Sequence, residues 1–239
     1  MAAELIAFKS LFPSPFGYAN FGESNRELNK ELIEDIETHR SKFESGERTF
    51  RANNNSWQSE GELERRYTSF EKLRKQIDEV ATPILRHSGY KEEHLPHIKV
   101  SNLWANVIFD VGGFSFPHIH PTHMSIWTGV YYPSGVEGGE YEDLNQFVEE
   151  DIIQLHRQKG DGALVLFDPS RDQKQLISGA LDDKEYYGGE VTIFPRESLL
   201  LLFPSWMPHM VMPLTTKTKR YSISFSIKKT YLEPSHGNL

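Results

Sequence analysis

The sequence predicts a mainly β protein with N-terminal helices, in which the strands close into an antiparallel barrel or jelly roll. Six strand-like segments follow residue 97, and they are separated by Gly, Pro and Asp rather than by helices. Residues 24–84, in contrast, carry apolar side chains at helical spacing. With 239 residues the chain is long enough for one sizeable core. We therefore expect a single domain over 1–239, with 1–97 as a helical support region and 98–239 as the β core.

The support region is expected to contain a short strand and two helices. The short strand and its loop fall within residues 1–23. Ser24 opens a capping-box pattern, so the first helix is expected to begin there. Asn53–Trp57 is expected to break the chain, and a second helix follows from about Glu60. Pro83 lies near its end, where it is expected to kink or stop the last turn.

The strands of the β core are short runs that are rich in β-branched, aromatic and other apolar residues. They are Ile98–Asp110, Met124–Tyr132, Gly162–Asp168, Glu190–Phe194, Ser198–Pro204 and Arg220–Lys229. The polar stretch Val136–Lys159 is expected to be a loop that acts as a flap over the barrel mouth, and 170–189 is similar.

Composition excludes several classes of function. The net charge of −8 gives no electrostatic reason to expect binding to nucleic acid or to an anionic membrane. The chain has no cysteine, which rules out disulfides, cysteine-bound zinc and a thiol nucleophile. The first ten residues lack the pattern of a signal peptide, and the longest apolar run, Leu199–Phe203, is too short to span a membrane. We expect a cytoplasmic protein.

Three histidines form a candidate metal site. His118 and His120 are two residues apart in an extended segment, so their side chains are expected to share one face. His209 follows His118 by 91 residues, after a turn with two prolines. Imidazole suits Fe, Zn, Cu and Ni, so these residue types do not select the metal. His123 breaks the alternation and is expected to be peripheral.

Arg220 and Ser222 form a candidate carboxylate clamp. A guanidinium is a planar fork that binds a carboxylate through two hydrogen bonds. Ser222 lies two residues along the same strand, where it can donate a third. Arg220 follows His209 by eleven residues, and one hairpin is expected to join them. The alternative for Arg220 is a salt bridge at the barrel rim.

Taken together, these motifs resemble a bacterial and phage family of Fe(II)/2-oxoglutarate-dependent oxygenases, which have a double-stranded β-helix core of the jelly-roll, cupin-like type. The resemblance covers nearly the whole chain. It rests on Phe12-Pro-Ser-Pro-Phe-Gly17, Trp57-Gln-Ser59, Trp104-Ala-Asn106, Pro117-His-Ile-His-Pro121, Thr128-Gly-Val-Tyr-Tyr132, Leu202-Phe-Pro-Ser-Trp206 with His209, and Arg220-Tyr-Ser-Ile-Ser-Phe225.

The resemblance implies a role for each matched position around the cosubstrate. Fe(II), 2-oxoglutarate and O₂ would be the cofactor and cosubstrates. Arg220 would pair with the distal carboxylate of 2-oxoglutarate, assisted by Ser222. Tyr131 or Tyr132 would hydrogen-bond the cosubstrate from a neighbouring strand, but strand alternation forbids both from facing inward.

The resemblance also assigns His118 and His209 as iron ligands. His120 departs from the family pattern, because the superfamily usually has Asp or Glu at that position. Two arrangements follow: a site with three histidines, or a site with two histidines and His120 outside the ligand set. We favour three histidines.

The expected function is hydroxylation, or a related C–H oxidation, of a small molecule or a side chain. Trp104, Asn106, Trp127 and Trp206 are candidates for a substrate pocket, with core packing as the alternative for the tryptophans. Two other hypotheses stay open: a cupin-like three-histidine metalloenzyme that does not use 2-oxoglutarate, and a non-catalytic jelly-roll binding protein. The sequence does not identify the substrate or the oligomeric state, for which a homodimer is one option.

Overall fold

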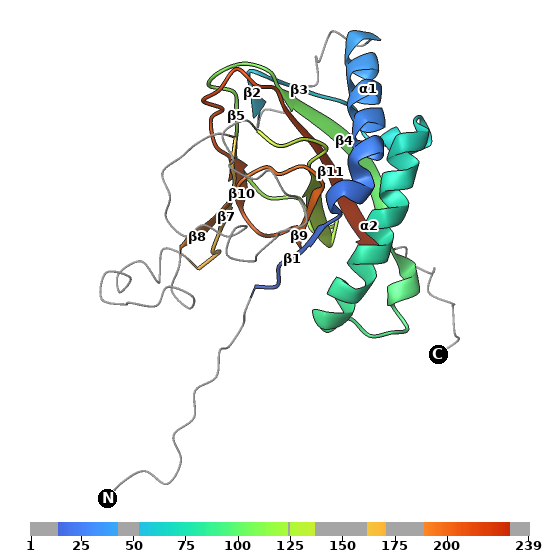
Figure 1. Ribbon diagram of the computed structural model, residues 1–239. Coiled ribbons are helices and arrows are strands. Elements are labelled where there is room, and N and C mark those ends of the chain that lie inside the picture. The colour runs from blue at the N-terminus through green and yellow to red at the C-terminus, as the bar shows by residue number, and fades with distance from the viewer. Residues whose placement is uncertain (1–13, 43–52, 124, 137–161, 171–188, 230–239) are drawn as a thin grey trace, which may run out of the picture.

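Two antiparallel β-sheets face each other, and two helices cover the outer face of the larger sheet (Figure 1). The computed structural model of the protein describes residues 14–42, 53–123, 125–136, 162–170 and 189–229. Within these ranges every pair of neighbouring strands is antiparallel. The expected mainly β architecture with N-terminal helices is therefore confirmed.

The two sheets differ in size and in the part of the site that they carry. The larger has the strand order β1 (Gly17–Asn20), β9 (Leu199–Pro204), β6 (Trp127–Tyr131), β11 (Arg220–Lys229), β4 (Ile98–Ile108) and β3 (Ser56–Gln58). The smaller has the order β2 (Asn53–Asn54), β5 (Phe114–His118), β10 (His209–Val211), β7 (Leu164–Phe167) and β8 (Glu190–Ile193).

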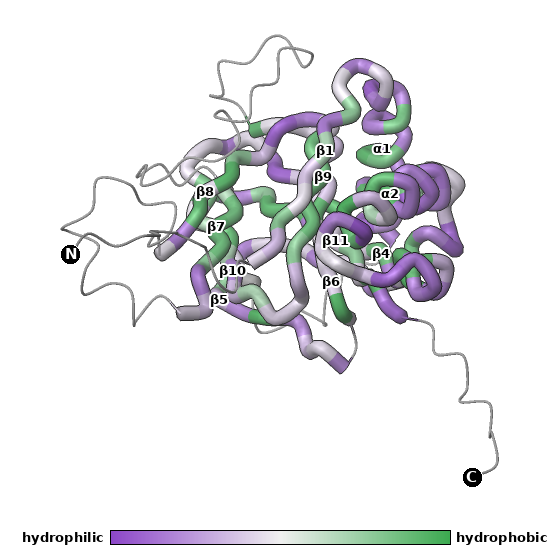
Figure 2. The backbone as a smooth tube through the Cα atoms, turned by 90° about the horizontal axis from the view of Figure 1, so that it is seen from below, coloured by the Kyte–Doolittle hydropathy of each residue, from purple (hydrophilic) through white to green (hydrophobic). Residues whose placement is uncertain are grey.

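Side-chain alternation along the strands creates two hydrophobic cores. On β9, Leu200 and Leu202 belong to the core that the larger sheet shares with the helices. Leu199, Leu201 and Phe203 point the other way, into the core between the sheets. A strand that is buried on both faces has to be apolar at every position, which explains the continuous apolar run of β9. Figure 2 shows this hydrophobic colouring along β9 and β7, in contrast to the hydrophilic outside of α2.

Both helices begin later than the predicted positions, which were Ser24 and about Glu60. α1 spans Arg26–Lys42 and α2 spans Thr68–His87, and the 3₁₀ helices Gly22–Asn25, Leu63–Arg65 and Leu95–His97 complete the helical elements of the described residues. Ser24 does not cap α1: it lies inside the first 3₁₀ helix, where Asn20 Oδ1 accepts from the Gly22 N–H instead. No helix within these ranges is long and apolar enough to cross a lipid bilayer.

Pro83 does not stop α2, which continues for four residues beyond it to His87. The reason is the apolar face of the helix, because Ile77, Ala81 and Leu85 are almost completely buried against the sheet. Burial of this face offsets the single backbone hydrogen bond that proline removes.

Each of the six predicted strands contains an observed strand, including the four-residue β7 and β8, but four other short strands were missed. Arg220–Lys229 coincides with β11, whereas β2, β3, β5 and β10 were not predicted as separate strands. Asn53–Trp57 was expected to break the chain, yet Ser56–Gln58 pairs with β4. Strands of two to five residues depend on pairing with distant segments, which local patterns do not record. The two predicted loops lie, apart from their ends, outside the described residues.

Candidate metal and cosubstrate site

The three predicted histidines meet at one end of the smaller sheet. His118 on β5 and His209 on β10 are direct cross-strand partners, and their ring centroids are 4.3 Å apart. His120 lies just after the end of β5, and its backbone N–H donates to Ser205 O at 2.9 Å. One ring nitrogen from each histidine lies within 4.8 Å of the others, so the cluster can hold a metal ion. His123 is exposed and outside the cluster.

Two of the rings are oriented for coordination through Nε2. Nδ1 of His118 is 2.7 Å from Phe116 O, and Nδ1 of His209 is 2.9 Å from Met207 O. In both cases a neutral ring that donates from Nδ1 to the carbonyl oxygen keeps a free lone pair on Nε2. Backbone acceptors thus select the tautomer that a metal ligand requires.

Burial favours the neutral form of two of the three rings, His209 and His120. It lowers the pKa of His209 to about 3, with a further decrease from the neighbouring His118. It also lowers the pKa of His120 to about 4, again with a contribution from His118. Near pH 7 both rings therefore offer lone pairs without first losing a proton. A set of three imidazole donors fits Fe(II), although not Fe(II) alone.

Arg220 is a buried cation on the opposite sheet. Only 2% of its surface is exposed. The guanidinium donates to Gly162 O at 2.7 Å, to Ser222 Oγ at 2.9 Å and to Tyr132 Oη at 3.4 Å. No carboxylate of the described residues pairs with it, and burial lowers its pKa. An uncompensated buried charge is costly, so this arrangement fits a site that receives an anionic ligand.

Gly162 provides the space that Arg220 occupies. Its φ is +67°, and a Cβ placed on it would lie 2.6 Å from Arg220 Cδ. Both the backbone conformation and the close contact therefore require glycine. This residue was predicted only as the start of a strand, and its role in the site was missed.

Strand alternation separates the two candidate tyrosines. Tyr132 lies in the core between the sheets beside Arg220, and its ring centroid is 5.2 Å from Arg220 Cζ. Tyr131 faces the helices, where its hydroxyl donates to Asn29 Oδ1 at 2.6 Å and accepts from Asn25 Nδ2 at 3.1 Å. Only Tyr132 thus lies next to the clamp.

The candidate substrate residues are also divided by alternation. The Trp104 ring lies 5.9 Å from the His120 ring, and Asn106 Nδ2 donates to Ser224 Oγ at 3.1 Å. Trp206 is 40% exposed. Trp127 lies in the helix-facing core instead, with its Nε1 donating to Tyr90 Oη, so it does not line the inner face.

His209 and Arg220 are not joined by a hairpin, contrary to the expectation. β10 and β11 belong to different sheets, so residues 212–219 cross from one sheet to the other. The crossing places the histidines and the guanidinium on opposing sheets. Ser224, which accepts the hydrogen bond from Asn106, belongs to the motif Arg220–Phe225, but no role was predicted for it.

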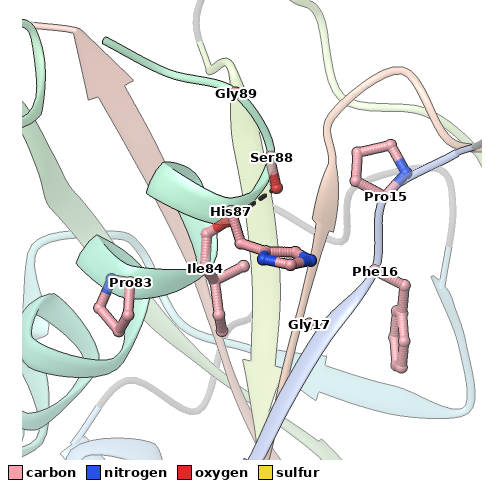
Figure 3. Close-up of a pocket in the computed structure, with 8 residues that line it drawn as sticks. All are labelled: Pro15, Phe16, Gly17, Pro83, Ile84, His87, Ser88 and Gly89. Carbon is pink, nitrogen blue, oxygen red and sulfur yellow. Dashed lines mark hydrogen bonds between the residues drawn. The ribbon is translucent and has the colours of Figure 1, made fainter. Parts of the chain in front are cut away.

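A separate cavity of about 650 Å³ lies between β1 and the C-terminal end of α2 (Figure 3). Its lining is mostly apolar and includes Phe16, Pro83 and Ile84. None of the histidines of the cluster and no residue of the clamp lines it.

Comparison with known proteins assigns the chain to a family. The family described as "Putative 2OG-Fe(II) oxygenase" matches residues 102–226, which is more than half of the chain. The protein therefore belongs to the 2-oxoglutarate- and Fe(II)-dependent oxygenase family, as the sequence motifs indicated. No curated protein matches the sequence.

Solved structures share the fold at low sequence identity. A Trichoplax adhaerens prolyl hydroxylase in complex with a hypoxia inducible factor peptide is 18% identical, with a TM-score of 0.53 and coverage of 90% of this chain and 84% of that chain. The epimerase SnoN with Fe³⁺, α-ketoglutarate and nogalamycin RO is 11% identical (TM-score 0.54; 90% and 79%). Iron-bound HygX from Streptomyces hygroscopicus is 10% identical (TM-score 0.53; 91% and 83%). The expected double-stranded β-helix core is confirmed.

Proposed function

We propose that the protein oxidises a C–H bond of a small molecule or a peptide side chain, with His118, His120 and His209 as the ligands of Fe(II). The observation that carries the proposal is that the histidine cluster lies on one sheet and Arg220 on the facing sheet. Arg220 is a buried guanidinium that has no carboxylate partner among the described residues. Bound iron and 2-oxoglutarate supply the oxidising chemistry with O₂, and the protein's own residues bind and orient the reactants.

In this proposal the clamp orients the cosubstrate. Arg220 binds its distal carboxylate, and Ser222 and Tyr132 contribute hydroxyl groups next to the guanidinium. Gly162 O accepts from Arg220 Nε and so fixes one edge of the fork. The remaining guanidinium nitrogens, which now contact Ser222 and Tyr132, are the ones available to a carboxylate.

The inner face of β4 forms the proposed substrate side. Trp104 lies beside His120, and Asn106 with Ser224 offers hydrogen-bonding groups one step further along. This combination suits a substrate with an apolar part near the metal and a neutral polar group beside it. Trp206, exposed after the end of β9, is a candidate for the rim. The proposal allows either a small molecule or a peptide side chain as the substrate. Structural neighbours have been solved in complex with ligands of both classes, namely a peptide fragment and nogalamycin RO.

The test is an anaerobic titration of the Fe(II)-loaded protein with 2-oxoglutarate, monitored by the visible charge-transfer band of the chelated cosubstrate. The wild type is expected to develop the band, and Arg220→Ala to require at least about a hundredfold more 2-oxoglutarate, since two charge-assisted hydrogen bonds are lost. Iron affinity should stay unchanged in this variant. A metal-loaded wild type without the band would contradict the proposal and favour a cupin-like enzyme or a binding protein. A cytoplasmic location and a homodimer stay predictions.

A further inference from the structure

Arg220 begins its strand, and that end of the strand is held on one side only. Arg220, Tyr221 and Ser222 pair with β4, opposite Ile108, Val107 and Asn106. Pairing of β11 with β6 starts later, at Ile223. A strand end with one lateral neighbour is held by fewer backbone hydrogen bonds than the strand centre, so its position depends more on contacts from its two faces.

On the outer face, one carboxylate of α1 contacts both chain neighbours of Arg220. Glu37 Oε1 accepts from Tyr221 Oη at 2.6 Å and from Lys219 Nζ at 3.0 Å. The alternation that sends Arg220 inward sends Tyr221 outward, toward this helix. Glu37 therefore binds the chain immediately before and immediately after the clamp residue.

Glu37 is itself held in place. Its second oxygen, Oε2, accepts from Arg40 Nη2 at 2.6 Å and from Arg40 Nε at 3.1 Å. Burial tends to raise the pKa of Glu37, but hydrogen bonds from Tyr221, Arg40 and Lys219 outweigh it and lower the pKa to about 2. The pKa of Tyr221 is raised by burial and by Glu37, so its hydroxyl stays a donor. The network is thus fully formed across the physiological pH range.

We propose that Glu37 is a positioning residue for 2-oxoglutarate binding, which fixes the backbone around Arg220 from the outer face of the sheet and thereby aims the guanidinium. The inference rests on the proposed function of Arg220. Inner-face hydrogen bonds to Gly162, Ser222 and Tyr132 set the fork, and Glu37 sets the strand end that carries it.

The test compares affinities for 2-oxoglutarate and for Fe(II) in anaerobic titrations of the full chain. Glu37→Ala is expected to weaken 2-oxoglutarate binding about tenfold with Fe(II) affinity unchanged, because a displaced guanidinium loses part of its two-point contact with the carboxylate, and the loss of about one hydrogen bond costs such a factor. Tyr221→Phe, which removes one donor, should give a smaller loss. The double variant should be no worse than Glu37→Ala alone, since both changes break the same contact.

Two further variants make the outcome specific. Glu37→Gln keeps an acceptor for Tyr221 and should recover part of the affinity. Glu31 lies on the same helix as Glu37, and Glu31→Ala breaks its exposed ion pair with Lys72 of α2. This variant should leave 2-oxoglutarate affinity at the wild-type value. A purely structural role for Glu37 would reduce the Fe(II) and 2-oxoglutarate affinities together, which would overturn the inference.

The result also separates this inference from the proposed function. If the wild type binds 2-oxoglutarate, Arg220→Ala does not, and Glu37→Ala binds it as the wild type does, only the role of Glu37 is rejected. If the wild type gives no charge-transfer band with iron bound, the proposed function fails and the inference fails with it.

Discussion

His118 and His209 lie directly opposite each other on neighbouring strands, and each ring is oriented by the carbonyl oxygen two residues before it in the chain. Their placement is fixed by the ladder between β5 and β10. His120 differs, because it follows the end of β5 and is positioned through Ser205 instead. The third ligand of the proposed site is therefore held by a loop contact rather than by a strand pair.

The first prediction concerns His120. His120→Ala should weaken Fe(II) binding by more than about a hundredfold, since loss of residues that only support a ligand costs about 10- to 100-fold. His120→Asp should retain iron, because two histidines and one carboxylate are the common facial set for Fe(II). Anaerobic competition with a chromogenic chelator measures both. His123→Ala, a change at the exposed histidine outside the cluster, is the control, and equal affinities of His120→Ala and His123→Ala would contradict a three-histidine site.

The second prediction concerns Gly162, where a side chain would be strained and would also collide with Arg220. Gly162→Ala should lower stability by about 1 kcal/mol or more from the left-handed backbone alone. It should also weaken 2-oxoglutarate binding, because a Cβ would lie 2.6 Å from Arg220 Cδ. Gly112→Ala is the matched control: its φ is +81°, and nothing beyond its own chain neighbours lies within 4 Å of the place that a Cβ would take. Denaturant unfolding should show a loss in both variants, whereas titration should show weaker binding only in the first.

The third prediction separates the adjacent tyrosines. Tyr131→Phe should lower the free energy of unfolding by about 1–3 kcal/mol, because Asn25 and Asn29 lose a buried hydrogen-bond partner. It should leave 2-oxoglutarate affinity unchanged. Tyr132→Phe should do the reverse, with weaker cosubstrate binding and little change in stability, since among the described residues its hydroxyl makes only a long contact with Arg220. Urea unfolding and the anaerobic titration, run on both variants, measure the two effects, and a shared phenotype would contradict the division.

Residue identity indicated the members of the candidate site, but not how the fold assembles them. The spacing of His118 and His120 and the alternation at Arg220 and Ser222 are local properties, and the sequence records them. Alternation also predicted that only one tyrosine would face inward, but not which one, because the direction of a strand face depends on its partners. The Gly162–Arg220 contact joins residues 58 positions apart, and no local pattern indicates it.

The same distinction explains the errors in the fold. β11 was located from ten residues of alternation, whereas β3 is three residues long and exists through its pairing with β4. The hairpin expected between His209 and Arg220 was an inference from a short separation in sequence. The chain uses that separation to change sheets.

The last prediction concerns acid stability and Glu37. The folded-state pKa is lowered to about 2 from an ordinary value of 4.5, so the ionised form is favoured by folding. Its stabilising contribution is present in full above about pH 4.5 and is lost as the pH falls toward 2. Glu37→Gln should therefore be less stable than the wild type at pH 7, and the difference should shrink between pH 4.5 and 2. Urea unfolding at pH 7, 5, 4 and 3 measures this difference. Glu31→Gln controls for the change in net charge. A wild-type advantage that stays constant down to pH 3 would show that the carboxylate charge of Glu37 does not contribute to the network with Tyr221, Lys219 and Arg40.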